Sequence, residues 1–273
     1  MTVVSWNVKG AQGPRDWSGI CAVLARLGAD VALLQEARPE WLDDRSVFLP
    51  GGIPGRNKFG PWGSAVVALT AGIDLEPIVE VEGQWRGRPQ GRAPLSCVSD
   101  GHVASAVAQT PAGPLSLISA YGLIQHGYAA GTMMRTLADI EPIFDDPDLG
   151  RNLILAGDWN IGTWWSGGDR KYVARHGAVL ALVQSYGLTD CIDAHLPQER
   201  GRLEGCPCEF GDDCRHVWTH KRAKSKSAYQ DDYVYASAGV SSRVVRAEPD
   251  PEWDWDLGIS DHIPLVLTIA NPA

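Results

Sequence analysis

The chain has 273 residues, of which 44% are hydrophobic and 21% charged, a composition typical of a folded, soluble protein. Its formal net charge of -9 excludes a protein coated uniformly with Lys and Arg that binds nucleic acid or anionic membrane by bulk charge. A local basic site stays possible.

The first 35 residues predict a strand, a helix and a second strand. Residues 2–8, TVVSWNV, are rich in β-branched side chains and predict a strand. Apolar residues from Ile20 to Leu27 recur at helical spacing, and Gly28 follows where a helix commonly ends. The apolar run at 31–35 has the length of a strand. This alternation indicates a parallel or mixed sheet covered by helices.

The rest of the chain continues the same pattern. We expect strands at 64–69, 102–109, 115–120, 152–156, 234–236, 241–247 and 263–269, and helices around 133–144 and 171–186. Long Gly- and Pro-rich connections separate them, at 49–63, 83–94, 122–131, 160–169 and 201–227. Neither a repeat nor a lasting shift in composition marks a boundary, so we expect a single α/β domain over residues 1–273. No apolar stretch of about 20 residues suggests a membrane span.

Polar residues follow four of the predicted strands. They form the clusters Trp6-Asn7, Gln35-Glu36, 157–160 (GDWN) and 260–262 (SDH). Strand ends in α/β folds converge at one edge of a sheet, and oxygen ligands from Asp, Glu and Asn suit Mg²⁺. Each cluster alone is a weak signal, because a turn, a helix cap or a salt bridge also explains it, and a turn is the better explanation of an isolated GDWN.

Taken in order, five motifs resemble those of the endonuclease/exonuclease/phosphatase superfamily. They are SWN at 5–7, LLQE at 33–36, GDWN at 157–160, DDYVY at 231–235 and SDHIPL at 260–265. The superfamily includes DNase I-like nucleases, AP endonucleases of the exonuclease III type, neutral sphingomyelinases and inositol polyphosphate 5-phosphatases. The resemblance implies a four-layer α/β sandwich, with two mixed β-sheets packed face to face and helices outside. It also implies hydrolysis of a phosphate ester with Mg²⁺ or Mn²⁺ as cofactor.

The resemblance further implies a role for each motif. Glu36 matches the main metal ligand, and Asn7 and Asp261 would line the same metal site. Asp158 matches the carboxylate that orients or deprotonates the attacking water, and Asn160 matches its phosphate-binding neighbour.

A histidine and a second carboxylate complete the implied centre. His262 would lie beside the scissile phosphate, with Asp232 orienting its ring and raising the pKa of the imidazole. Tyr121, in SAYGLI, stands where the superfamily often has Tyr or His, and a half-buried aromatic at a strand end explains it equally well. The Tyr-x-Pro-Asn pattern of AP endonucleases is absent after Tyr121, and QEAR replaces the usual QET-Lys. We therefore do not expect an enzyme specific for abasic sites.

Three of the six cysteines lie close together in the connection at 201–227. A histidine follows them, so the segment contains Cys206, Cys208, Cys214 and His216. Three thiols and one imidazole are the ligand types of a structural Cys₃His zinc site. His220 is an alternative ligand, and reduced thiols or a disulfide are alternative explanations. The other cysteines occupy apolar contexts and are expected in the core: Cys21, Cys97 and Cys191.

Two segments carry basic residues beside aromatic ones, a combination that suits the backbone and bases of nucleic acid. One is QWRGRPQGR, and the other runs from Arg215 to Lys226. Candidate substrate-binding residues in them are Arg86, Arg88, Arg92, Arg222 and Lys224. Solvated surface loops are the alternative explanation. Trp164-Trp165 could form a stacking platform. Five acids lie between 247 and 257, just before SDH, and could help to hold a metal.

Together these features predict a Mg²⁺-dependent phosphodiesterase that cleaves nucleic acid, as an endonuclease or an exonuclease. A phosphatase or phospholipase that acts on small or lipid phosphoesters is the main alternative. A further alternative is a binding scaffold without catalytic activity. The motifs argue against it, because residues suited to catalysis occupy all of the key polar positions. The N-terminal residues lack the pattern of an export signal, so a cytoplasmic location is expected. The sequence leaves the oligomeric state open.

Overall fold

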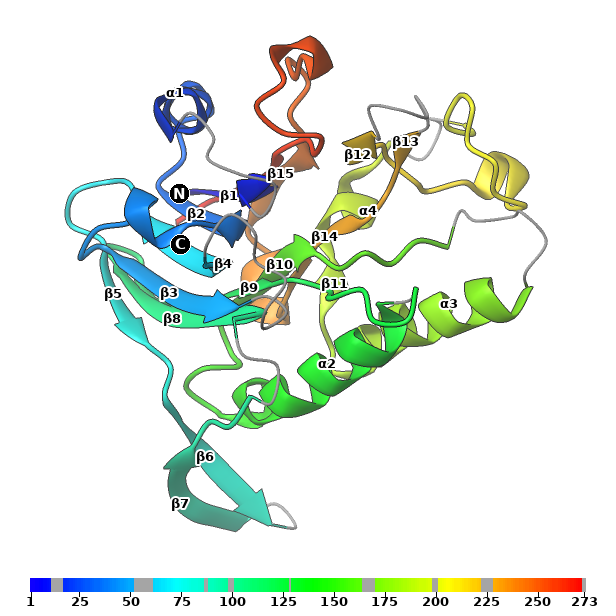
Figure 1. Cartoon of the computed structure of the whole chain (residues 1–273). Helices are drawn as coiled ribbons and strands as arrows, with labels where there is room; N and C mark the ends of the chain where they lie inside the picture. The colour runs from blue at the N-terminus through cyan, green and yellow to red at the C-terminus, as the bar shows by residue number, and fades with distance from the viewer. Residues whose placement is uncertain are drawn as a thin grey trace.

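The computed structural model describes residues 1–10, 17–51, 61–85, 88–97, 101–127, 129–163, 170–197, 201–221 and 228–271. Its centre is a pair of six-stranded mixed sheets (Figure 1). The first has the order β15 (Val244–Pro249), β16 (Leu265–Ile269), β1 (Thr2–Asn7), β2 (Val31–Ala37), β4 (Trp62–Ala68) and β3 (Ser46–Gly51). The second has the order β11 (Thr189–Asp190), β14 (Asp232–Ala236), β10 (Leu153–Asp158), β9 (Gly113–Ala120), β8 (Val103–Thr110) and β5 (Asp74–Pro77).

Shorter elements surround the sheets. Two strand pairs lie outside them, β6 (Glu80–Trp85) with β7 (Arg88–Pro94) and β12 (His220–Lys221) with β13 (Ala228–Tyr229). The α-helices are α1 (Trp17–Arg26), α2 (Ala130–Asp145), α3 (Arg170–Ser185), α4 (Cys191–His195) and α5 (Ala238–Ser241). The 3₁₀ turns in the part of the chain that the structure describes include η2 (Pro39–Trp41), η4 (Gly211–Asp213) and η5 (Trp255–Leu257). Among the helices of the described ranges, none is both long and apolar enough to cross a membrane.

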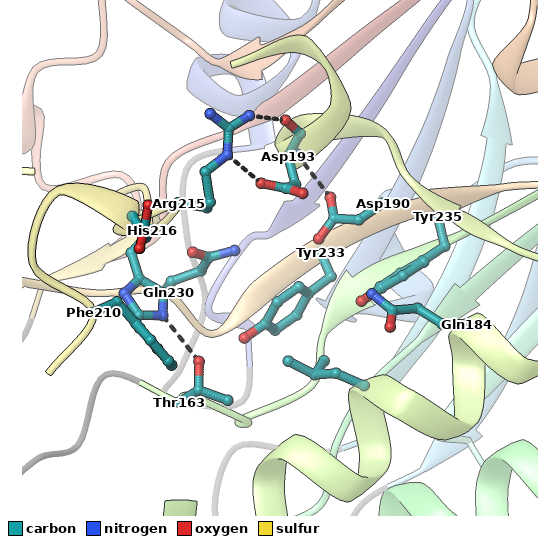
Figure 2. A pocket seen from close by; sticks show the side chains of 12 residues that line it. Thr163, Gln184, Asp190, Asp193, Phe210, Arg215, His216, Gln230, Tyr233 and Tyr235 are labelled. Carbon is teal, nitrogen blue, oxygen red and sulfur yellow. Dashed lines mark hydrogen bonds and ion pairs between the residues drawn. The ribbon is translucent and has the colours of Figure 1, made fainter. Parts of the chain in front are cut away.

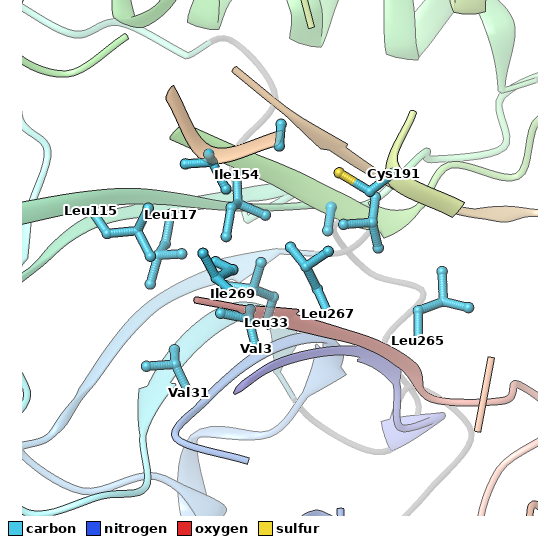
Figure 3. Packing of buried hydrophobic residues seen from close by; sticks show 14 of the residues in the cluster. Val3, Val31, Leu33, Leu115, Leu117, Ile154, Cys191, Leu265, Leu267 and Ile269 are labelled. Carbon is cyan, nitrogen blue, oxygen red and sulfur yellow. The ribbon is translucent and has the colours of Figure 1, made fainter. Parts of the chain in front are cut away.

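Both sheets place alternate side chains on opposite faces, which produces a layered core. On β1, Val3 points between the sheets, whereas Val4 and Trp6 point outward. The inner cluster joins Val3 to Leu117 of β9 and to further residues of both sheets (Figure 3). The side chains of this cluster are mainly aliphatic, so burial of apolar area between the sheets provides the main driving force for their packing.

Helices cover the outer faces of both sheets. Helix α1 buries Ile20 and Leu24 against the first sheet. Helices α2 and α3 bury Met133, Leu137 and Val179 against the second. The four layers confirm the predicted α/β sandwich with two mixed sheets inside and helices outside.

Three predicted connections contain strand residues, one of them the two-residue strand β12 in the connection at 201–227. Residues 83–94 were expected to be a loop but lie mostly in β6 and β7, whose register shifts between Glu82 and Gln84. Gly and Pro hide the alternation in this segment, and packing of Ile78 and Val81 beside α2 stabilises it. Strand β3 was also missed, because Pro50 interrupts its pattern; an edge strand tolerates proline.

Candidate active site

The carboxyl ends of β1 and β10 meet where the two sheets approach each other. Asn7 is the last residue of β1 and Asp158 the last of β10. Asn7 Nδ2 donates a hydrogen bond to Asp158 Oδ2 over 2.8 Å, and both side chains are buried. The polar clusters that the sequence placed at strand ends therefore belong to one site that spans both sheets.

A buried polar link lies beneath this site. Gln35 Nε2 donates to Ser119 Oγ at 3.0 Å, and Ser119 Oγ donates to the carbonyl oxygen of Leu34 at 2.8 Å. These two bonds tie β2 of the first sheet to β9 of the second. Because both side chains are buried, their bonds fix the relative position of the strands that carry the site.

Glu36 is held in an unusual backbone conformation. Its φ is 54°, in the left-handed region that non-glycine residues rarely adopt, and such strain is concentrated at functional sites. Gly10 makes this possible, because a Cβ at that position would lie 2.1 Å from the carbonyl oxygen of Glu36. Asn7 Nδ2 approaches Glu36 Oε1 at 3.3 Å. The Glu36 carboxylate thus lies beside Asn7, which also donates to Asp158.

Tyr121 lies in the same cluster, at the end of β9. Its hydroxyl forms hydrogen bonds with Glu36 and Asn160. Burial, and then the negative charges of Glu36 and Asp158, raise the pKa of Tyr121 well above its ordinary value. The phenol stays neutral and can donate a hydrogen bond into the site.

His262 lies between two carboxylates. Its Nδ1 donates to Asp232 Oδ2 at 2.9 Å, and its Nε2 is 3.7 Å from Asp158 Oδ2. Burial opposes the charged form of His262, but Asp232, Asp158 and Asp261 outweigh it and raise the pKa of the imidazole to about 10. Burial, followed by repulsion from Asp232, raises the pKa of Asp158, although His262 opposes this. The site therefore combines a buried imidazolium with a carboxylate that readily takes up a proton.

Asn160 is positioned by the turn that follows β10. Its φ is 50°, its backbone N donates to Asp158 Oδ1 at 3.0 Å, and its Nδ2 donates to the carbonyl oxygen of Gly122 at 3.0 Å. A Cβ on Gly122 would lie 1.9 Å from the carbonyl oxygen of Trp159. Only glycine permits this approach, which brings Asn160 next to Asp158.

Asp261 forms an ion pair with a lysine just after the end of the first strand. Lys9 Nζ lies 2.7 Å from Asp261 Oδ2, while Lys9 N donates to Asn7 Oδ1 at 2.8 Å. Burial favours protonated Asp261, but the charges of His262 and Lys9 prevail and lower the pKa of the carboxyl. The sequence analysis did not identify Lys9. Lysine is usually exposed, and the role of Lys9 depends on its contact with Asp261, which lies 252 residues later in the chain.

His220 is a second imidazole at the site. The rings of His220 and His262 are stacked, with centroids 4.2 Å apart and planes 2° apart. His220 Nδ1 lies 2.9 Å from Asp231 Oδ2. The cluster formed by the three cysteines contains His216 and not His220, which lies instead with Asp261 and His262.

The donor set near Asn7 suits a hard divalent cation. Glu36 and Asp158 supply carboxylate oxygens that converge on Asn7, and their charges are offset in part by the His262 imidazolium. Such oxygen-rich sets fit Mg²⁺ or Mn²⁺. Asn7 Oδ1 accepts a hydrogen bond from the backbone N of Lys9. For this oxygen to bind a metal ion, the side-chain amide of Asn7 would have to rotate.

The predicted zinc ligands also come together. One ligand atom from each of Cys206, Cys208, Cys214 and His216 lies within 4.8 Å of the others, and all four residues are buried. Cys191 is buried in the core, whereas Cys21 and Cys97 are only partly buried.

Of the predicted substrate-binding residues, the two that the structure describes lie apart from this centre. Arg88 and Arg92 are on the β6–β7 pair, which projects from the sheets beside α2 (Figure 1). Arg92 donates to the carbonyl oxygen of Glu80. Arg86, Arg222, Lys224 and Trp164-Trp165 fall outside the described residues. Of the acidic run before SDH, Asp250 is buried and paired with Arg26 of α1, so this carboxylate is not available to a metal at the site.

Comparisons with known proteins place these features in context. The sequence profile of the Endonuclease/Exonuclease/phosphatase family matches residues 4–262. A search of the curated proteins finds no match.

Solved structures share the fold. The chain is similar to an AP endonuclease from Leishmania major at 15% identity and a TM-score of 0.66, over 99% of this chain and 88% of that one. It is similar to the endonuclease domain of TRAS1, a telomere-specific non-LTR retrotransposon, at 16% identity and a TM-score of 0.60, over 98% and 97%. TDP2 from D. rerio, complexed with a single-strand DNA product, matches at 16% identity and a TM-score of 0.59, over 99% and 98%.

Proposed function

The chain belongs to the endonuclease/exonuclease/phosphatase family, and on this premise we propose that it is a divalent-metal-dependent phosphodiesterase that hydrolyses nucleic acid. The observation that carries the proposal is the buried group of Asp158, Asp232 and His262, hydrogen-bonded through Asn7 to Glu36. A structural core has little use for so many buried charges, because each costs several kcal/mol of desolvation, about the stability of a small domain.

Each member of this group has a chemical task in phosphodiester hydrolysis. The reaction needs an in-line water, neutralisation of the non-bridging oxygens and stabilisation of the leaving oxygen. Asp158 would accept a proton from the attacking water, which its raised pKa favours. His262, held as a cation by Asp232, would bind a phosphate oxygen or donate a proton to the leaving oxygen.

Other side chains would bind the metal and the phosphate. A Mg²⁺ or Mn²⁺ ion held by Glu36, with Asn7 and Asp261 beside it, would supply Lewis-acid stabilisation of the phosphate charge. Tyr121 and Asn160 would contact the same phosphate through a hydroxyl and an amide, since both border Glu36 or Asp158.

The proposed substrate class is supported by the rim of the site. Lys221 Nζ lies over the ring of Trp255, 5.7 Å from its centroid, and Lys221 N donates to the carbonyl oxygen of Asp261. A cation and an aromatic surface next to the hydrolytic group suit a nucleic-acid backbone and a stacked base. The DNA complex of the D. rerio protein with the same fold agrees with this choice.

The proposal is tested with a panel of phosphoesters. Purified protein is incubated, with Mg²⁺ added or omitted, with duplex DNA, single-stranded DNA, abasic duplex, RNA, sphingomyelin and inositol phosphates. We expect Mg²⁺-dependent cleavage of DNA or RNA, with no preference for the abasic duplex. Cleavage of lipid or inositol phosphates alone would support the alternative family activity, and cleavage of none of the panel would contradict the proposed enzyme.

A further inference from the structure

The connection from 201 to 221 has almost no regular structure, yet its cysteines are buried. Its described helical element is the single 3₁₀ turn η4. The side chains of Cys206, Cys208 and Cys214 are each 3% exposed. The apolar side chains that pack against them are only partly buried: Leu203, Trp218 and Tyr229. Ordering the backbone costs about 1–2 kcal/mol per residue, and this small apolar cluster cannot offset that cost across the connection.

The later part of the connection contacts the body of the protein, because Arg215 pairs with Asp193 and Val217 is buried in the core between the sheets. A pocket of about 270 Å³ nevertheless lies between the connection, helix α3 and strand β14. Phe210 and His216 form one wall of this pocket, whereas Tyr233 and Tyr235 form another (Figure 2). Around the three cysteines, apolar contact therefore contributes little to holding the connection in place.

The geometry of the cysteine cluster indicates what holds it. His216 Nδ1 is 3.4 Å from Cys206 Sγ and 3.7 Å from Cys214 Sγ. A tetrahedral zinc ion with bonds of about 2.3 Å to sulfur and about 2.0 Å to nitrogen requires ligand atoms about 3.5–3.8 Å apart. The two distances agree with this spacing, and none of the three cysteines forms a disulfide in the structure.

The surroundings of the four residues complete the pattern of a metal site. His216 Nδ1 faces the sulfur atoms of Cys206 and Cys214. The other ring nitrogen, Nε2, lies 2.9 Å from Thr163 Oγ1 (Figure 2). Metal-bound histidines commonly donate their second nitrogen in this way. Arg202 donates to the carbonyl oxygens of Cys206 and Cys208, which brings a positive charge beside a site that three thiolates and Zn²⁺ would leave negative.

We propose that Cys206, Cys208, Cys214 and His216 bind one structural Zn²⁺ that anchors the connection to the rim of the hydrolytic site. All four positions are filled by protein ligands, so the ion has no open position and serves stability. Zinc ligation is independent of the proposed hydrolysis and can be tested without it.

The anchored segment reaches the hydrolytic site by two routes. The first is the hydrogen bond to Thr163, three residues after Asn160. The second is the chain after His216, where the Thr219 hydroxyl accepts from the backbone N of Asp232 at 3.2 Å. The next residue, His220, stacks on His262. Loss of the ion would therefore loosen the segment that borders both Asp232 and His262.

Elemental analysis of the full chain tests the site. Protein purified from zinc-supplemented culture should contain about one equivalent of zinc. The Cys208→Ser/Cys214→Ser variant should lose it, while Cys21→Ser, which removes a thiol of α1, should retain it. Less than a tenth of an equivalent in the wild type, another metal in its place, or zinc unchanged in the double variant would overturn the proposal.

Two further measurements on the wild type remain informative if the double variant fails to fold. Replacement by Co²⁺ should give the visible absorption of a tetrahedral ion with sulfur ligands, and an octahedral spectrum would contradict the assignment. A thiol count in denaturant should find all six cysteines reduced. A deficit of two thiols in freshly purified protein would show a disulfide and overturn zinc binding.

Discussion

Asp158 and Asp232 lie opposite each other on the antiparallel strands β10 and β14, and both carboxylates face the ring of His262. Two acids in direct register would repel each other in a buried site. The imidazolium between them offsets this repulsion, so the three ionisable groups act as one unit.

The protonation of His262 should depend on the negative charge of Asp232. The three neighbouring carboxylates raise the pKa of His262 to about 10 against the effect of burial, so the ring stays protonated at neutral pH and loses its proton as the pH rises through that value. In Asp232→Asn the pKa should fall. We expect the alkaline limb of kcat/KM to move to lower pH and the rate at neutral pH to fall about 100-fold. Superimposable pH-rate profiles of variant and wild type would refute this role.

Glu36 should control the affinity for Mg²⁺. Substitution of groups that merely support a metal ligand costs about 10–100-fold in affinity or activity, and a direct ligand should cost at least as much. Glu36→Gln should therefore raise the Mg²⁺ concentration for half-maximal hydrolysis by about 100-fold or more. Glu40→Gln, four residues away and paired with Arg38, is the matched control and should leave the titration unchanged.

Lys9 tests whether Asp261 contributes to metal binding. In the structure Lys9 neutralises Asp261, so a metal that uses this carboxylate must compete with the ammonium group. Lys9→Gln should lower the Mg²⁺ concentration for half-maximal activity, and Asp261→Asn should raise it. An unchanged Mg²⁺ titration in Lys9→Gln would remove Asp261 from the ligand set, whatever the effect of the variant on maximal rate.

Two glycines should respond oppositely to alanine. At Gly122 a Cβ would lie 1.9 Å from the backbone oxygen of Trp159, so Gly122→Ala should lower the free energy of unfolding by about 3 kcal/mol. At Gly177, inside α3, nothing lies within 4 Å of the added carbon, so Gly177→Ala should raise it by about 0.5–1 kcal/mol. Urea unfolding measures both, and equal effects would contradict the close contact at Gly122.

The fold was largely predictable because its strands carry unbroken apolar runs. Strands β1, β2 and β10 bury nearly every residue, so composition alone revealed them. The β6–β7 pair and β3 were missed, since Gly and Pro interrupt their patterns and packing against neighbouring elements stabilises them.

The site was predictable where a motif stands at the end of a strand. Glu36, Asp158 and His262 follow directly from such motifs. Lys9 and the stacking of His220 on His262 were not foreseen, because each depends on a contact between distant segments. Such contacts cannot be predicted from the sequence of either segment alone. The basic segment from Arg215 is a further example. Its composition suggested a surface for nucleic acid, but Arg215 forms an ion pair with Asp193, a contact that composition does not predict.

The central claim is metal-dependent hydrolysis of nucleic acid at Asp158. The most direct measurement compares cleavage of an oligonucleotide by wild type, Asp158→Asn and Asp148→Asn in metal-depleted buffer with and without added Mg²⁺. Asp148 is exposed and provides the matched control. We predict Mg²⁺-dependent cleavage by wild type and Asp148→Asn, and a rate about 10³-fold lower in a folded Asp158→Asn. Cleavage without Mg²⁺, or an Asp158→Asn variant as fast as the wild type, would contradict the account.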